Sequence, residues 1–337
     1  MILVLVDHDR GELDQLSLRA LTAARKLGQD VEAIVIGKEG AALAGIVGEY
    51  GAKVLHVASH TNLTDYTPMA SGRALKDLVE KLKPAAVLAA GSPRGNEQLA
   101  HLAAFLDLPM AAECSEITLG SPHHVLRARW AGNLIESANV HADLLIASVL
   151  AFSTEPESAN GSAATVTEFE PALEPQDYAV KVLSRDAGES KGGVTLNDAK
   201  VIVSGGRGVG GPDGFGQIEE LANLLGGTVG CSRVVTSSGW RPHAEQVGQT
   251  GTKVAPDLYI AAGISGAMQH IAGMKNSKTI VVINTDPEAP ILGYADYAII
   301  GDLHQVIPAL TSAIRQAKGW FTKCNHCIFA NMAKSIT

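Results

Sequence analysis

The residues best suited to chemistry lie in five short segments of glycine and polar residues in the second half of the chain. They read SGGRGVGG (204–211), GCSR (230–233), QVGQTG (246–251), GISGAMQH (263–270) and INTDPEAP (283–290). Each segment follows an apolar, strand-like run. Because ligands of parallel α/β sheets bind at the carboxyl ends of the strands, we expect these segments to line one long ligand cleft.

The first segment has the composition of a phosphate-binding turn. Its glycines would let backbone N–H groups approach a diphosphate, and Arg207 would supply positive charge. The spacing is GxGxGG rather than GxGxxG and lacks the Walker lysine, so an ordinary tight turn between strand and helix fits equally well. Sixteen of the nineteen glycines after residue 200 lie between Gly205 and Gly273. Such crowding indicates positive φ angles or close approach to a bulky group, of which a cofactor is one example.

The position of His270, in the fourth segment, does not by itself indicate a functional role. A lone histidine among apolar neighbours on a helix is more often a satisfied core residue than a functional one. No Ser/His/Asp spacing, paired carboxylates or HExxH motif accompanies it. The cleft therefore shows no hydrolytic machinery, and we assign neither a catalytic residue nor a metal site.

The elements that must position these segments alternate between strand and helix along the chain. In the first half, four buried runs separated by helical patterns predict a parallel sheet; they lie at 2–6, 31–37, 52–58 and 85–91. Three later runs without intervening helices predict an antiparallel addition; they lie at 125–131, 134–140 and 144–152. A polar stretch rich in Ser, Glu, Pro and Gly follows, interrupted by one predicted strand at 177–183.

The second half repeats the alternation on a smaller scale. Its predicted strands lie at 200–206, 257–262, 279–283 and 297–300, and its predicted helices at 215–225, 265–274 and 303–318. The fold class is therefore α/β, with two doubly wound α/β domains, the first carrying an antiparallel addition and the second Rossmann-like. The predicted boundaries are 1–184 for the first domain, 185–199 for a linker, 200–318 for the second domain and 319–337 for a C-terminal tail.

Composition excludes several classes of partner and location. The 337 residues carry a net charge of −8, so a basic nucleic-acid footprint is missing. The longest apolar runs are far shorter than the ~20 residues that cross a bilayer, and no presequence is visible. Four cysteines are too few for a disulfide scaffold. We expect a cytoplasmic protein of bacterial or archaeal type, although a mature form that has lost a targeting peptide would look the same.

The stretch from about Lys200 to Leu310 resembles the FAD domain of the electron-transfer flavoprotein α subunit. It matches the family's ordered motifs SGGRG, LG.TVG.SR, QVGQTG, VAPDLYIA.GISGA.QH.AGM, SKTIV.IN.DPEAPI and ADY.I.GDL. The N-terminal half resembles the family more loosely, in its first strand and helix and in AAGSPRGNEQLA. The resemblance implies one FAD per chain, held by Gly206, Arg207, Gly208, Ser232, Arg233, Gln246, Val247, Gly248, Gln249, Thr250, Gly251, Gly263, Ser265, Gly266, Gln269, His270, Asn284, Asp302 and Leu303.

Three of these positions match the neighbourhood of the isoalloxazine ring in the family. The resemblance implies that Arg233 is the cation beside the ring, Thr250 offers a hydroxyl and a backbone group near N5, and His270 faces the O2 edge. Reduction builds negative charge along N1, O2 and N5, which a fixed cation and donors stabilise. His270 is then interpreted as a flavin contact rather than a core residue.

The implied function is that of an electron carrier, not an enzyme with its own substrate. The expected partners are an electron-transfer flavoprotein β subunit, flavin dehydrogenases such as acyl-CoA dehydrogenases of fatty acid β-oxidation, and an acceptor such as a quinone oxidoreductase. Alternatives are a self-sufficient FAD- or NAD-dependent oxidoreductase, an electron-bifurcating variant with a second FAD in the β subunit, and a nucleotide-binding regulatory module on the first domain. The first domain is expected to supply a contact surface for the β subunit.

The chain departs from the family in three places. TSSGW (236–240) lacks the acidic residue that usually precedes GW, and His101 lies where the family's typical arginine follows the GSPRGNEQ-like loop. The family's last helix normally ends near Lys318, but this chain continues to Thr337 with a CxxC pair, Cys324 and Cys327. A single CxxC completes neither a haem nor a zinc motif. We interpret the tail as an extension without a function, with a redox dithiol or an intersubunit metal site as alternatives.

Overall fold

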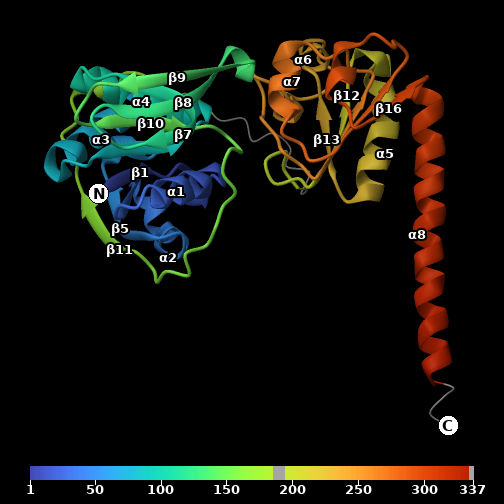
Figure 1. Ribbon diagram of the computed structural model, residues 1–337, viewed down its shortest axis with the longest axis horizontal. Coiled ribbons are helices and arrows are strands. Elements are labelled where there is room, and N and C mark those ends of the chain that lie inside the picture. Colours follow the sequence, from blue (N-terminus) through green and yellow to red (C-terminus); the bar gives the residue numbers. More distant parts are fainter. Residues whose placement is uncertain (185–193, 334–337) are drawn as a thin grey trace. The chain divides into compact units, whose positions relative to one another are not determined.

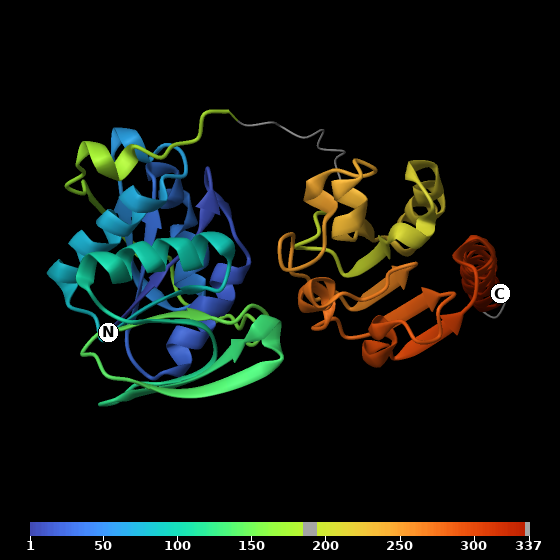
Figure 2. The ribbon, with the colours of Figure 1, turned by 90° about the horizontal axis from the view of Figure 1, so that it is seen from above.

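The computed structural model describes residues 1–184 and 194–333, with side chains only as far as Lys318 in the last helix (Figure 1). The chain folds into two compact units, Met1–Gly188 and Glu189–Thr337. Each unit has a sheet with helices on both faces, wholly parallel in the second unit and mainly parallel in the first (Figure 2). This confirms the predicted α/β class with two doubly wound parts.

The first unit is built on a nine-stranded sheet with the order β11-β5-β4-β1-β6-β10-β7-β8-β9. Its strands are β1 (Ile2–Leu5), β4 (Val31–Ile36), β5 (Ala52–Ala58), β6 (Ala86–Ala90), β7 (Met110–Thr118), β8 (His123–Arg129), β9 (Leu134–Val140), β10 (Leu145–Val149) and β11 (Thr165–Phe169). A separate small ribbon joins β2 (His8–Asp9) and β3 (Glu12–Leu13). The helices are α1 (Leu16–Lys26), α2 (Ala44–Glu49), α3 (Pro68–Leu82) and α4 (Pro93–Leu106).

Strand β1 shows why helices cover both faces of this sheet. All four of its residues are buried, and alternate side chains point to opposite faces. Ile2 and Val4 pack in a cluster with Leu21 of α1, whereas Leu3 and Leu5 pack with side chains of α3 and α4. A strand that is apolar on both faces requires a helical layer on each side.

Three expectations for the first unit were wrong in detail. Only β7, β8 and β9 form the antiparallel addition, because the third predicted run contains β10, which pairs parallel with both β6 and β7. The predicted strand at 177–183 is absent from the described residues; instead a 3-10 turn (Pro175–Tyr178) begins at a proline and a capping box. A strand missed by the sequence pattern, β11, pairs parallel with β5, so tertiary pairing overrides its weak local signal.

The second unit has a five-stranded parallel sheet with the order β13-β12-β14-β15-β16. Its strands are β12 (Val201–Gly205), β13 (Thr228–Cys231), β14 (Leu258–Ala262), β15 (Ile280–Asn284) and β16 (Tyr297–Ile300). Its helices are α5 (Phe215–Leu225), α6 (Arg233–Ser237), α7 (Met268–Met274) and α8 (Leu303–Ala333). The chain reverses its winding direction between β12 and β14, which makes the gap between these strand ends the expected ligand position.

Alternate side chains of β14 again point into two different layers of the unit. Tyr259 and Ala261 of β14 join a cluster with Met274 of α7, and their neighbours Ile260 and Ala262 join a cluster that includes residues of α5 and α8. Figure 1 shows α7 on one side of the strands and α5 and α8 on the other. The functional segments therefore emerge from a sheet that is fixed on both faces.

The ends of the second unit differ from the predicted boundaries. Leu196 and Ala199 are buried in the core of this unit, so the described end of the predicted 185–199 linker belongs to it; residues 185–193 lie outside the described residues. The last helix, expected to end at Lys318, continues as one helix to Ala333. Residues 334–337 and the side chains of Cys324 and Cys327 lie outside the described part, so the interpretation of the tail stays a prediction.

The corresponding winding reversal in the first unit, between β1 and β6, is filled by protein side chains. Arg94, at the start of α4, lies over the Tyr66 ring at 4.7 Å and places a guanidinium nitrogen 3.7 Å from a carboxylate oxygen of Asp7. The cavity that remains here has a volume of about 40 Å³, far below the ~300 Å³ of small-molecule sites. Burial raises the pKa of Asp7 to about 6, although the charge of Arg94 acts in the opposite direction.

The raised pKa of Asp7 makes the stability of the first unit depend on pH. The folded state holds this proton more tightly than the unfolded chain, so the stabilisation is complete below about pH 4 and is lost as the pH rises through about 6. Asp7→Asn should therefore stabilise the first unit at pH 8 by on the order of 2 to 3 kcal/mol, and much less at pH 4. Hydrogen exchange of the β1 and β6 amides at the two pH values measures this.

Asp30→Asn is the matched control, because Lys53 lowers the pKa of this exposed carboxyl. Asp30→Asn should not stabilise the first unit at pH 8. A variant at Asp7 with the same stability as the parent at pH 8 would contradict the assignment.

Glycines let the turns after β12 and β14 touch through their backbones. The N–H of Gly206 donates to the carbonyl of Ala262 at 2.9 Å, and that of Gly208 to the carbonyl of Gly263 at 3.0 Å. A Cβ added to Gly206 would collide with the carbonyl oxygen of Gly263. Gly263 itself has a φ of +63°, which glycine adopts without cost.

Gly206→Ala should therefore destabilise the second unit by about 1 to 3 kcal/mol, since neither backbone can move without breaking the paired strands. Thermal unfolding of the full chain would show a lower midpoint for this unit. Gly216→Ala is the control, because this helical glycine faces open space and its replacement should be neutral or slightly stabilising. Equal midpoints for the two variants would refute the close-approach argument.

Candidate functional site

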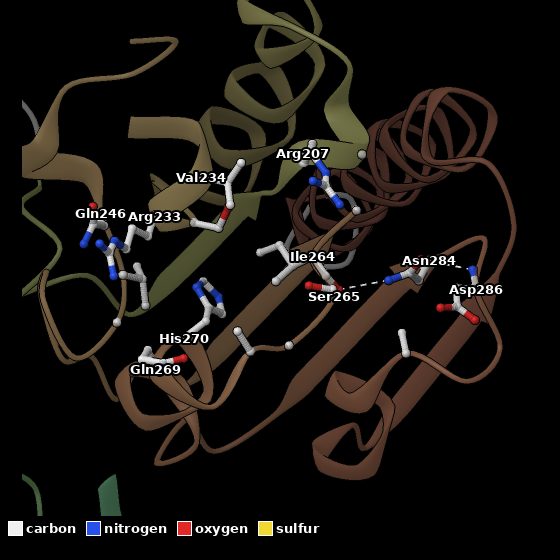
Figure 3. Close-up of a pocket in the computed structure, with 18 of the residues that line it drawn as sticks. Arg207, Arg233, Val234, Gln246, Ile264, Ser265, Gln269, His270, Asn284 and Asp286 are labelled. Carbon is white, nitrogen blue, oxygen red and sulfur yellow. Dashed lines mark hydrogen bonds between the residues drawn. The ribbon is translucent and has the colours of Figure 1, made fainter. Parts of the chain in front are cut away.

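A cavity of about 700 Å³ lies within the second unit, at the carboxyl ends of its strands. It is lined by the turns after β12, β13, β14 and β15, by the loop at 246–250, and by the start of α8. The volume falls within the ~300–1,000 Å³ range of cofactor sites. Figure 3 shows the labelled side chains spread along the cavity, with Gln246, Arg233, Gln269 and His270 toward one end and Asn284 and Asp286 toward the other.

Seventeen of the nineteen residues expected at the site line this cavity. They are Arg207, Gly208, Ser232, Arg233, Gln246, Val247, Gly248, Gln249, Thr250, Gly263, Ser265, Gly266, Gln269, His270, Asn284, Asp302 and Leu303. The other two, Gly206 and Gly251, are structural: a Cβ on Gly206 would collide with Gly263, and one on Gly251 with the carbonyl of Gln246. These two glycines shape the turns whose neighbours face the cavity.

Further lining residues were missed by the sequence analysis. They are Val234, Ser237, Ser238, Ile264, Ala267, Thr285, Asp286, Ala289 and Gly301. Most lie inside the quoted motifs, so their position between expected site residues could have identified them. Ser238 is the residue before GW, which means that the departure from the family pattern falls in the cavity itself.

Two expectations about the segments differ from the structure. QVGQTG does not follow a strand of its own; it joins the end of β13 through isolated bridges, with Val247 N–H donating to the carbonyl of Cys231. In SGGRGVGG, the N–H groups of Gly206, Gly208, Val209 and Gly210 all donate to backbone carbonyls. The predicted phosphate cradle of free N–H groups is therefore not formed at these four positions, although Arg207 does face the cavity (Figure 3).

At one end of the cavity, Gln246 organises the polar side chains. This residue is only 2% exposed; its amide oxygen accepts from Thr236 at 2.5 Å and its amide nitrogen donates to Thr250 at 3.0 Å. The chain just before it is held by Arg241, which bonds to Glu245 and to Glu219 of α5. The Thr250 hydroxyl is thus placed by a buried amide.

Arg233 is presented by the first residue of α6, immediately after β13. Its side chain is exposed and lines the cavity. The described residues give it no carboxylate partner within salt-bridge distance. Its positive charge is therefore available to a ligand.

His270 lies on α7, and its ring has features of both a core residue and a ligand contact. It is 6% exposed and packed like a core residue, yet it lines the cavity. Nε2 lies 2.9 Å from the Tyr259 hydroxyl, whereas buried Nδ1 has no hydrogen-bond partner among the described residues. Burial lowers the pKa of His270 to about 4, against a smaller opposing effect of the Val247 backbone. The imidazole is therefore neutral at pH 7.

Helix α7 is held against the loop at 246–252 by direct backbone contact. The N–H of Gln249 donates to the carbonyl of Gln269 at 2.8 Å, and that of Val254 to the carbonyl of Gly273 at 2.7 Å. A Cβ on Gly273 would collide with the backbone of Gly248. His270 and Thr250 thus belong to one rigid end of the cavity.

The other end is formed by the turn after β15 and the start of α8. Asn284 donates to the carbonyl of Ile264 at 2.9 Å, and its amide oxygen accepts from the N–H of Asp286 at 3.1 Å (Figure 3). Asp302 accepts from the N–H of His304 at 2.9 Å and so caps α8. Leu303 is 5% exposed and also packs in the core.

The described residues offer neither a helix that could cross a membrane nor a cluster that could hold a metal ion. No helix there combines the length and apolar character needed to cross a bilayer. No group of three or more His, Cys, Asp or Glu side chains in that part of the chain is arranged to hold a metal ion.

Comparison with known proteins agrees with the position of the cavity. Residues 195–275 match the family model described as the electron transfer flavoprotein FAD-binding domain, and residues 2–174 match the electron transfer flavoprotein domain. The chain is 39% identical to electron transfer flavoprotein subunit alpha of Mycobacterium leprae over 321 residues, covering 94% of this chain and 99% of the relative. It is 37% identical to the protein of the same name from Thermoanaerobacterium thermosaccharolyticum over 328 residues, covering 94% and 98%.

A third relative, electron transfer flavoprotein subunit alpha of Bacillus subtilis, is 34% identical over 322 residues, covering 94% of this chain and 97% of its own. These alignments cover both units, including the first, where the sequence motifs gave only a loose resemblance. The chain belongs to the electron transfer flavoprotein α-subunit family.

Proposed function

We propose that FAD occupies the 700 Å³ cavity with its isoalloxazine ring beside Arg233, Thr250 and His270. The carrying observation is that seventeen residues expected from family motifs, scattered over nearly a hundred positions, line this cavity together. The donor chemistry also fits. The buried Nδ1 of His270 has no hydrogen-bond partner among the described residues and could bond to a polar ligand atom, and Arg207 and Arg233 supply two positive charges for an anionic ligand.

The rest of the dinucleotide would extend toward Arg207, Ser265, Asn284 and Asp302. Asn284 is already oriented by its bond to Ile264, so it would meet the ligand without reorganisation. Gly263 and Gly266 have positive φ, and a Cβ there would collide with Gly208 or Ile291, so these glycines shape the turn at the switch point between β12 and β14.

The protein's contribution to electron transfer is to bias the cofactor electrostatically. Bound flavin accepts and donates electrons, and negative charge accumulates along N1, O2 and N5 when it is reduced. Arg233 would stabilise that charge, because no carboxylate of the described residues lies within salt-bridge distance of it. Gln246 holds the Thr250 hydroxyl at 3.0 Å, and α7 holds the neutral His270 ring at the same end of the cavity.

A carrier fits this cavity better than a self-sufficient oxidoreductase. Such an enzyme needs an acid or base beside the ring. The carboxylates among the lining residues are Asp286 and Asp302; Asp286 lies toward the end opposite His270 (Figure 3), and Asp302 caps α8. Burial lowers the pKa of His270 to about 4, so this imidazole is a weak base. The hydroxyl and the cation at the same end of the cavity can tune a flavin potential.

We further propose that the physiological complex is a heterodimer with an electron-transfer flavoprotein β subunit. The cavity is lined by exposed residues, among them Arg207, Thr250 and Val234, the last 46% exposed, so a partner is expected to cover it. Donors would be flavin dehydrogenases such as acyl-CoA dehydrogenases, and the acceptor a quinone oxidoreductase. Whether a second FAD makes the complex bifurcating depends on the β subunit.

Cys114 and Cys231 are buried free thiols, which fits the proposed cytoplasmic location.

The flavin content of the chain, with and without its partner, tests this function. Expressed alone, the chain should retain little FAD and tend to associate through its uncovered cavity mouth. Co-expression with the β subunit should give a yellow heterodimer with at least one FAD, and no NADH turnover by this chain's own site. Absorbance and light scattering measure both properties; a monodisperse, fully flavinated lone chain would contradict the proposal.

Removing the charge of Arg233 should make the flavin harder to reduce. A unit charge several Å from the ring is worth roughly 1 to 4 kcal/mol at effective dielectric constants between water and a protein surface. For a one-electron couple, with 59 mV per tenfold change, this is about 40 to 170 mV. Because Arg233 is exposed, we expect Arg233→Ala to lower the first reduction potential of the heterodimer by an amount near the lower value, measured by spectroelectrochemistry.

Two further variants make this test specific. Arg233→Lys should retain part of the potential, because it keeps the charge but loses the planar fork. Arg207→Ala removes an arginine from another part of the same cavity and should weaken FAD binding more than it shifts the potential. An unchanged potential in Arg233→Ala would remove Arg233 from the ring.

A further inference from the structure

The Tyr259 hydroxyl contacts the back of the His270 ring from inside the protein core. Tyr259 is fully buried on β14, and its hydroxyl oxygen lies 2.9 Å from His270 Nε2. The two rings are tilted by 56°, with their centroids 6.2 Å apart. Nε2 therefore points at the sheet, while the other ring nitrogen, Nδ1, makes no hydrogen bond of ordinary geometry with the described residues. The Val247 backbone lies close enough to the ring to raise its pKa, against the larger effect of burial.

The chemistry of a neutral imidazole links these two nitrogens. It carries one N–H, so if one nitrogen accepts a hydrogen bond, the other must be the donor. Nδ1 needs its own partner because it is buried. A ligand carbonyl or ring nitrogen offers only a lone pair to this site, so Nδ1 has to carry the hydrogen and Nε2 has to accept.

We propose that Tyr259 is a positioning residue for the flavin site: its phenol donates to His270 Nε2, fixes the Nδ1–H tautomer, and aims that donor into the cavity. The proposal rests on the proposed function for the identity of the ligand. The protonated nitrogen of His270 is measured on the flavin-free protein, so the positioning role and the proposed function can fail separately.

The surroundings make this hydroxyl hard to replace. His270 is 6% exposed, so bulk water does not reach Nε2 freely. Burial keeps the phenol protonated by raising the pKa of Tyr259, which preserves its ability to donate. The Tyr259 ring also packs in the cluster with Met274 and Val247. Tyr259→Phe keeps that packing and removes only the hydroxyl.

The first experiment measures the tautomer directly. The full chain, co-purified with its β subunit and then freed of flavin, is labelled with ¹⁵N-histidine, and long-range ¹H–¹⁵N spectra assign the protonated nitrogen of His270. We expect Nδ1–H in the parent protein, and the Nε2–H form or a mixture in Tyr259→Phe. Tyr66→Phe is the matched control, because it also removes a phenol hydrogen bond, to Glu97 at 2.7 Å in the first unit.

The second experiment measures the consequence for flavin. With a donor lost at the ring, Tyr259→Phe should reduce the preference of the heterodimer for reduced over oxidised flavin by about tenfold, which corresponds to a potential about 59 mV lower for a one-electron couple. In a His270→Leu background, Tyr259→Phe should change the preference for reduced over oxidised flavin by less than twofold. This double-mutant cycle separates a role through His270 from a general packing effect.

Each outcome decides the proposal. Nε2–H in the parent protein overturns it without any variant, and so does an unchanged tautomer in Tyr259→Phe or an undiminished effect in the His270→Leu background. If the parent heterodimer binds no FAD, the proposed function fails, while the tautomer measurement still tests Tyr259. If FAD binds and Tyr66→Phe shifts the potential as much as Tyr259→Phe, the positioning role is refuted and the proposed function stands.

Discussion

Direct contact between backbones at the carboxyl edge of the second sheet is the constraint on which the proposed flavin cavity depends. The turns after β12 and β14 meet at Gly206, Gly208 and Gly263, and α7 meets the 246–252 loop at Gly273 and Gly248. A side chain at either contact would separate the segments that carry Arg207, Ser265, Thr250 and His270. The glycine crowding is therefore explained largely by protein-to-protein contact, with the ligand using the space that these contacts leave open.

The two units show how one architecture produces a filled site and an open one. Both wind parallel strands in two directions from a central strand, and both therefore have a gap beside the ends of two neighbouring strands. In the first unit, Arg94, Tyr66 and Asp7 fill that gap and leave about 40 Å³. In the second, glycine turns keep side chains out and leave about 700 Å³. Side-chain size after the strands, not strand order, decides whether a cofactor fits.

The electrostatic character of the cavity is local and differs from that of the chain. The protein has a net charge of −8, yet Arg207 and Arg233 line the cavity and His270 is held neutral by burial. A neutral imidazole has a defined donor and a defined acceptor, whereas a charged one has two donors. The site thus combines fixed positive charge at its surface with a buried group whose hydrogen-bonding direction can be set by one neighbour.

The sequence by itself determined the α/β class, the alternation that buries β1 and β14 on both faces, and the membership of most of the site. The class and the alternation follow from local patterns, since residue type and spacing specify an element, whereas the site residues follow from the resemblance of the ordered motifs to the family. Pairing partners between distant strands were decided only by the tertiary structure. β10 inserts between β6 and β7, β11 joins β5, and the 246–251 loop joins β13 rather than ending a strand of its own. The same holds for Tyr259, which reads as one aromatic residue in a strand. Its contact with His270 exists because β14 and α7 stack face to face, and an interaction between side chains of two packed layers has no signature in the spacing of either element.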